Sequence, residues 1–217
     1  VVITATKFQQ KQNTTGKVVS VIDKEMLQRN AGKTITEIIN TQTGVFINGA
    51  NNNLGTNQDV YFRGASSGNT LILIDGIPVG DPSQIKNSFD LNSLAIGQIE
   101  RIEILKGAQS TLWGSDAVAG VINIITKKGG AQLFAPSALL SYGSYNTFRG
   151  SVGVNGSLSN FSYNLNYNLT DSKGFSAAYD STDKANFDDD KFNQSNLQAN
   201  FGYKISNRFS IKGFYTD

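Results

Sequence analysis

The chain has 217 residues, a formal net charge of +2, and neither cysteine nor histidine. This composition excludes disulfides, zinc–thiolate sites, cysteine nucleophiles and imidazole-based catalysis, and it leaves any metal to oxygen ligands. The net charge is too small to indicate nucleic acid as a partner. No signal peptide is recognisable, and no apolar run of about 18 residues predicts a membrane-spanning helix. Alternating strands of about 10 residues are a weaker membrane signal, and the composition does not exclude them.

Residues 1 to about 130 have the pattern of an α+β domain, with a small mixed sheet and short helices. Residues 17–22 are rich in β-branched side chains and predict a strand. Asp23 then stands where a helix N-cap is expected, and Thr34 and Glu37 form a capping-box pattern ahead of a second helix. We expect Gly44 to end that second helix, because glycine is the common residue after a helix C-terminus.

Further strands are predicted at residues 59–63, 70–75, 99–105 and 118–126. Asp75-Gly76 is a turn signal directly after the second of these strands. Arg101 and Glu103 are two positions apart on one predicted strand, so their side chains share one face of the sheet.

The pattern changes from about residue 136 to strict alternation. In residues 161–169, large apolar or aromatic side chains alternate with serine or asparagine, and residues 197–205 repeat this. A soluble antiparallel sheet also alternates. Here the polar face is rich in asparagine, the apolar face in tyrosine and phenylalanine, and short connections alternate with the long one at residues 171–191. These features favour membrane-spanning strands of an outer-membrane β-barrel.

Five stretches carry a resemblance to a known family, and they occur in the family's order. They are residues 1–6 (VVITAT), 60–64 (VYFRG), 71–79 (LILIDGIPV), 99–107 (IERIEILKG) and 112–124 (LWGSDAVAGVINI). Together they resemble the TonB-dependent outer-membrane receptors. The resemblance implies a plug domain with a remnant of the TonB box at residues 1–130. It also implies, at residues 131–217, about five strands of a truncated barrel of about 22 strands.

Within that family the chain is most similar to the vitamin B12 receptors. Residues 141–145 resemble a run on their first strand, and residues 187–192 (FDDDKF) resemble their acidic calcium-binding loop, except that Lys191 stands where glycine is expected. The implied function is active transport of a corrinoid, without enzymatic activity. A ferric-siderophore receptor is the alternative within the family, because those receptors share the plug motifs. A soluble periplasmic binding or signalling module is the alternative outside it.

The resemblance also implies partners and the segments that meet them. The N-terminal segment would contact the TonB energy transducer by adding a strand to its sheet. The residues of this segment are Val1, Val2, Ile3, Thr4 and Ala5. Charged side chains would form a polar interface between plug and barrel wall. They are Arg63, Arg101 and Glu103.

Two polar loops match the plug loops that meet ligand in this family, and amide side chains suit a neutral polar ligand. Their candidate ligand-binding residues are Asn51, Asn52, Asn53, Asn57, Asp81, Gln84, Asn87 and Ser88. No cofactor is required, but calcium could screen the carboxylates of the long acidic loop, because Ca²⁺ takes about six to eight oxygen ligands. The candidate calcium ligands are Asp180, Asp183, Asp188, Asp189 and Asp190.

Overall fold

The computed structural model describes residues 2–3, 10–11, 16–83, 86, 89–130, 132–178, 187–206 and 208–217. By their contacts these residues form two units. The first holds Val1–Asn51 and Asn57–Thr126, and the second holds Asn52–Thr56 and Lys127–Asp217. Within the described residues, no helix is long and apolar enough to span a membrane.

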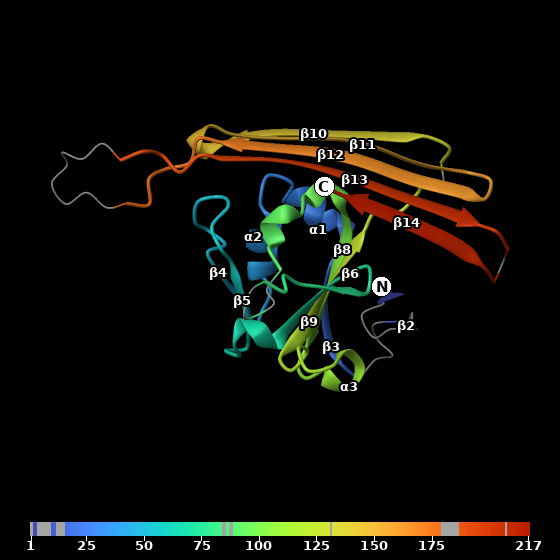
Figure 1. The fold of residues 1–217 in the computed structure, drawn as a ribbon, viewed down its shortest axis with the longest axis horizontal. Helices are drawn as coiled ribbons and strands as arrows, with labels where there is room; N and C mark the ends of the chain where they lie inside the picture. The colour runs from blue at the N-terminus through green and yellow to red at the C-terminus, as the bar shows by residue number, and fades with distance from the viewer. Residues whose placement is uncertain are drawn as a thin grey trace. The chain divides into compact units, whose positions relative to one another are not determined.

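The first unit is built on a five-stranded mixed sheet with the order β3-β8-β9-β6-β7 (Figure 1). Strand β9 lies at its centre, antiparallel to β8 and parallel to β6. The strands are β3 (Val18–Ile22), β6 (Thr70–Ile74), β7 (Ile77–Val79), β8 (Ile99–Lys106) and β9 (Gly120–Thr126). Two short pairs accompany the sheet: β1 (Val2–Ile3) with β2 (Gln10–Lys11), and β4 (Val45–Asn48) with β5 (Asp59–Phe62).

Both faces of this sheet are covered, as the burial of every residue of β9 requires. Ile102, Ile104, Ile122 and Ile124 belong to the larger apolar cluster, together with the helices. The residues between them point the other way, and Leu105 and Val121 belong to a second, smaller cluster. A strand with apolar side chains on both faces has a nearly continuous apolar sequence, and β9 fits this except at Asn123.

Local signals set the helix starts as predicted. Asp23 caps α1 (Lys24–Arg29), because its carboxylate accepts from the Met26 N–H at 2.9 Å. Thr34 and Glu37 form the expected capping box of α2 (Ile35–Asn40). The predicted end of α2 at Gly44 is wrong, because Thr41 ends the helix and its hydroxyl donates to the Ile38 carbonyl at 2.7 Å. Gly44 instead has φ +81° in the turn before β4.

Short helical segments complete the first unit. They are η2 (Ser67–Asn69), η3 (Leu91–Ser93), η4 (Ile96–Gln98) and α3 (Ser110–Trp113). Trp113 is the only tryptophan of the chain, and it packs against the smaller apolar cluster.

The second unit is a five-stranded antiparallel sheet in chain order, β10-β11-β12-β13-β14. Its strands are β10 (Ala135–Gly143), β11 (Thr147–Leu158), β12 (Phe161–Ser172), β13 (Phe192–Lys204) and β14 (Ser210–Thr216), with η5 (Ser144–Asn146) between the first two. Short turns join β11 to β12 and β13 to β14, whereas a long connection joins β12 to β13. This alternation of short and long connections is the predicted one.

A soluble sheet buries its apolar face and exposes its polar face, and this sheet does the opposite. Asn164, Asn166 and Asn168 of β12 are buried, at 1%, 3% and 6% exposure. Between them Leu165 and Tyr167 are 37% and 45% exposed. The register places Tyr167 opposite Leu197 and Tyr163 opposite Phe201, so the apolar side chains of neighbouring strands share one face. The expected alternation is therefore confirmed, with asparagine on one face and leucine and tyrosine on the other.

Candidate functional site

A polar group interrupts the apolar face at one end of the first unit's sheet. It consists of Asp75, Arg101, Glu103, Asn123 and Thr126, and we call it the polar seam. The register brings these residues together, since Glu103 lies opposite Asn123 and Arg101 opposite Ile125. Asp75 follows β6 directly, at the level where Ile74 pairs with Ile124.

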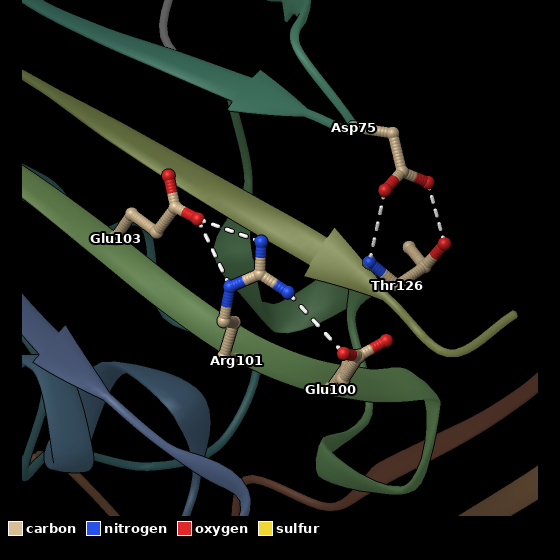
Figure 2. A network of polar contacts seen from close by, with 5 residues as sticks. All are labelled: Asp75, Glu100, Arg101, Glu103 and Thr126. Atoms are coloured by element: carbon tan, nitrogen blue, oxygen red, sulfur yellow. Dashed lines mark hydrogen bonds and ion pairs between the residues drawn. The ribbon is translucent and has the colours of Figure 1, made fainter. Parts of the chain in front are cut away.

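Arg101 is the charged centre of the polar seam (Figure 2). Its Nη2 lies 2.8 Å from Oε1 of Glu103, and its Nε donates to the same oxygen at 2.9 Å. Its Nη1 lies 3.2 Å from Oε1 of Glu100. Glu103 is fully buried, whereas the side chain of Glu100 is 45% exposed. A register shift between Ile99 and Arg101 leaves Glu100 outside the regular ladder, and this allows it to reach the arginine.

Asp75 joins β6 to β9 at the other side of the polar seam. It adopts φ +51°, which turns the chain at the Asp75-Gly76 step that the sequence predicts. One oxygen of its carboxylate accepts from the Thr126 N–H at 3.2 Å, and the other accepts from the Thr126 hydroxyl. The Gly76 N–H donates to Asn123 Oδ1 at 3.1 Å. These hydrogen bonds tie the ends of the two parallel strands β6 and β9 together.

Of the three residues predicted to lie at the plug–barrel interface, two lie in the polar seam and one does not. Arg101 and Glu103 share a face, as their spacing predicts, and the structure adds an ion pair between them that was not predicted. Arg63 lies apart from them, after β5, with φ +49° and an exposed side chain. Its backbone N–H donates to the Gly44 carbonyl at 2.9 Å.

The candidate ligand residues of the first loop lie in the β4–β5 connection. Asn51, Asn52 and Asn57 are exposed, but Asn53 is buried. The Asn53 amide is hydrogen-bonded to Phe175 and Asp190 within the second unit. In the second loop, Asp81 accepts from the Ser83 N–H at 2.9 Å and from the Ser83 hydroxyl at 2.6 Å. Gln84, Asn87 and Ser88 lie outside the described residues.

The acidic loop and the N-terminal segment are described in part. Asp189 lies 3.3 Å from the Lys173 ammonium, Asp190 accepts from Asn53 and from the Ala177 N–H, and Asp188 is exposed. Within the described residues no group of three or more potential metal ligands gathers. Val2 and Ile3 form β1, which pairs with β2. The candidates outside the described residues are Val1, Thr4, Ala5, Asp180 and Asp183.

Sequence reasoning missed an attachment of the segment that follows β9. Asn164 and Asn200, directly opposite each other on β12 and β13, both donate to the Lys127 carbonyl, at 3.0 and 3.2 Å. Further along, the Ser157 N–H donates to Gln132 and the Tyr163 hydroxyl to Leu133, at 2.8 and 2.9 Å. We call residues 127–133 the linker. The signal in the sequence is the asparagine on the polar face, but alternation alone does not tell which asparagines bind a backbone carbonyl.

Three comparisons with known proteins bear on the whole chain. The family model described as TonB-dependent Receptor Plug Domain matches residues 11–121, just over half of the 217 residues. The vitamin B12 transporter BtuB of Vibrio cholerae is 37% identical over 132 residues, which are 61% of this chain and 21% of that protein. BtuB of Photobacterium profundum is 30% identical over 219 residues, which are 100% of this chain and 35% of that protein.

A solved structure agrees at the level of the fold. The siderophore receptor PirA from Acinetobacter baumannii superposes with a TM-score of 0.70 at 24% identity, covering 91% of this chain and 31% of that one. The chain thus spans about a third or less of the length of the relatives it matches. From the family model, the relatives and the fold together, this chain belongs to the TonB-dependent receptors of the outer membrane, and it carries their plug domain followed by strands of their barrel.

Proposed function

We propose that the chain is the N-terminal part of a transporter that takes a scarce, large ligand through the outer membrane at the expense of TonB-coupled energy. The observation that carries the proposal is the polarity of the second unit, whose sheet buries asparagine and exposes leucine and tyrosine. Such a sheet suits lipid on one side and an aqueous lumen on the other. The plug motifs of residues 11–121 precede it on the same chain.

The proposed ligand is a corrinoid such as vitamin B12. Two relatives that bear the name vitamin B12 transporter are 37% and 30% identical to the chain. The exposed side chains of Asn51, Asn52 and Asn57 offer donors and acceptors without charge, which suits a ligand rimmed by amides. Asp81, Gln84, Asn87 and Ser88 would add to this surface from the second loop.

The proposed partner is the TonB transducer, which would bind the segment Val1, Val2, Ile3, Thr4 and Ala5 by strand addition. The short strand β1 supports this, because it shows that Val2–Ile3 adopts the extended form that such pairing needs. The enclosing barrel would have about 22 strands. In the described sheet β10 and β14 each pair on one side, so further strands would have to cover both edges.

The charged residues Arg63, Arg101 and Glu103 are proposed as part of the polar interface between plug and barrel wall. Polar groups separate at lower cost than packed apolar ones when water replaces their partners, so such an interface suits a plug that rearranges. The ion pair of Arg101 with Glu103 supports a structural contribution of these charges as well.

Calcium is proposed as an aid to ordering the long acidic loop. Three consecutive carboxylates, Asp188, Asp189 and Asp190, supply the hard oxygen ligands that Ca²⁺ prefers, and Asp180 and Asp183 would complete the set. Two of these carboxylates have protein donors, so the ion would have to displace Lys173 from Asp189 and share Asp190 with Asn53.

The test is titration of the full-length receptor in detergent with cyanocobalamin, with and without calcium. We expect saturable binding at micromolar ligand or below, tightened by calcium. An N51A/N57A variant should bind more weakly, because it removes two exposed amides. Binding of a ferric siderophore instead would overturn the corrinoid and leave the transporter in place. A receptor that is monodisperse without detergent would overturn the transporter itself.

A further inference from the structure

The buried amide of Asn53 is hydrogen-bonded at both of its polar atoms to the connection between β12 and β13. Its Nδ2 donates to the Phe175 carbonyl at 2.6 Å, and its Oδ1 accepts from the Phe175 N–H at 3.2 Å. One side chain thus pairs with both backbone groups of Phe175, as a neighbouring strand would. Residues 52–56 belong to the second unit by their contacts, although the chain places them between β4 and β5.

The same Nδ2 also reaches the far end of that connection. It donates to Oδ2 of Asp190 at 3.0 Å, and the Ala177 N–H donates to the same oxygen at 3.0 Å. Asn53 therefore joins the outgoing limb of the connection, at residues 173–178, to its returning limb, at residues 187–191. We call the group of Asn53, Phe175, Ala177 and Asp190 the clasp.

Two glycines allow the limbs to come this close. Gly55 has φ +82°, and a Cβ there would lie 2.6 Å from Cδ2 of the Phe192 ring. Gly174 has φ +68°, and a Cβ there would overlap the Asp190 carbonyl oxygen. Either position would strain a residue with a side chain, both in its backbone and against its neighbour. The approach of the three segments therefore depends on two glycines that lie far apart in the chain.

We propose that Asn53 is a positioning residue that holds residues 173–178 and 187–191 together, so that the order of these two limbs depends on the position of residues 52–56. Asp190 also joins the two limbs, because its N–H donates to the Phe175 carbonyl at 3.4 Å and its carboxylate accepts from the Ala177 N–H. Asn53 adds three hydrogen bonds to this link and orients the Asp190 carboxylate toward Ala177. A shift of residues 52–56 would remove the three hydrogen bonds of Asn53 together. The inference rests on the proposed function only for its consequence, namely that in a transporter a shift of residues 52–56 would loosen both limbs together.

The test is amide hydrogen exchange of the intact receptor in detergent, without ligand. In Asn53→Ala we expect the Phe175 and Ala177 amides to exchange at least about tenfold faster, because the first loses its acceptor and the second loses the partner that orients Asp190. Asn52→Ala is the matched control, since Asn52 is the exposed neighbour. Unchanged exchange in Asn53→Ala, or an equal increase in Asn52→Ala, would overturn the proposal.

Swapping the amide and the carboxylate between positions 53 and 190 distinguishes a positioning effect of Asn53 from general damage to the fold. Asn53→Asp places two carboxylates within hydrogen-bonding distance, where they repel each other. We expect it to accelerate exchange at Ala177 as strongly as Asn53→Ala does. The double variant N53D/D190N restores a donor opposite an acceptor and should slow exchange again. If the double variant exchanges as fast as Asn53→Asp alone, the clasp is wrong. Because no ligand is present, this result is independent of whether the receptor binds a corrinoid.

Discussion

Glu100 and Glu103 both form ion pairs with Arg101, but Glu103 is buried and Glu100 is partly exposed. The two pairs therefore allow the effect of burial on an ion pair to be compared. Glu103 is fully buried and receives two N–H groups of Arg101, whereas Glu100 is partly exposed and receives one. Exposed ion pairs contribute little because water and salt screen them. A buried carboxylate that loses its partner, or an arginine that loses its buried carboxylate, leaves a charge without compensation.

We therefore predict different effects for the same substitution at these two sites. Glu103→Gln should lower the free energy of unfolding of the first unit by about 3 kcal/mol. Glu100→Gln should lower it by less than about 1 kcal/mol. Urea unfolding followed by the fluorescence of Trp113 measures this in the whole chain, because the only tryptophan lies in the first unit. Equal losses for the two variants would mean that the seam does not depend on burial of the pair.

Secondary-structure elements that are specified by neighbouring residues in the sequence were predictable. Elements and contacts that depend on residues far away in the sequence were not. The start of α2 follows from Thr34 and Glu37, which lie within one turn of each other. The strand β7 at residues 77–79 was missed, because its three residues gain order from pairing with β6 rather than from their own pattern. The same holds for Asn53, whose burial depends on Phe175, 122 residues further along the chain. Nothing near Asn53 in the sequence distinguishes it from Asn52.

The described residues of the linker, 127–130 and 132–133, have no regular secondary structure, but hydrogen bonds attach them to the second unit. Gly129 comes so close to β11 and β12 that a Cβ there would lie 2.7 Å from the Gly156 carbonyl oxygen and 2.9 Å from the Tyr163 nitrogen. These neighbours are backbone atoms and cannot move aside without disturbing the sheet. The attachment therefore requires glycine at this position, in addition to the two asparagines that hold Lys127.

We predict that Gly129→Ala exposes the linker to trypsin, which cuts after Lys127 and Lys128. Cleavage at these two sites, followed by mass spectrometry on the chain in detergent, should be at least about tenfold faster than in the unchanged protein. N164A/N200A should act in the same direction, because it removes both donors to the Lys127 carbonyl. Gly143→Ala is the control, since a Cβ there meets nothing within 4 Å. Protection that persists in both linker variants would show that other contacts hold the segment.

At the scale of the whole molecule, the apolar face of the second unit's sheet determines whether the protein requires lipid or detergent. Phe161, Tyr163 and Phe201 stack on this face, with ring centroids 6.2 Å apart for each pair that includes Phe161. Leu158 and Leu165 lie on the same face, the first beside the short β11–β12 turn and the second further along β12. A lipid bilayer treats these two places differently, because its centre is far less polar than its surface.

We predict a cost that depends on depth when this face is charged. In the full-length receptor folded into phospholipid vesicles, Leu165→Lys should lower the free energy of unfolding by about 2–4 kcal/mol. Leu158→Lys should lower it by about 0–1 kcal/mol, because the turn lies near the membrane surface. Urea titration of the vesicle-bound protein measures both values. If the two variants unfold at the same urea concentration, the face does not lie in lipid.

The central position of β9 also has a consequence for the order in which the plug can fold. Before Gly120 is reached, β3 pairs only with β8 and β6 only with β7, so the five-stranded sheet consists of two separate strand pairs. Strand β9 is the last plug strand along the chain, and it joins these groups through antiparallel pairing on one side and parallel pairing on the other. Contacts between strands that lie far apart in sequence form slowly, because the chain must first close a long loop. The sheet is therefore completed only when the segment next to the linker arrives, so the plug closes from its barrel-connected end.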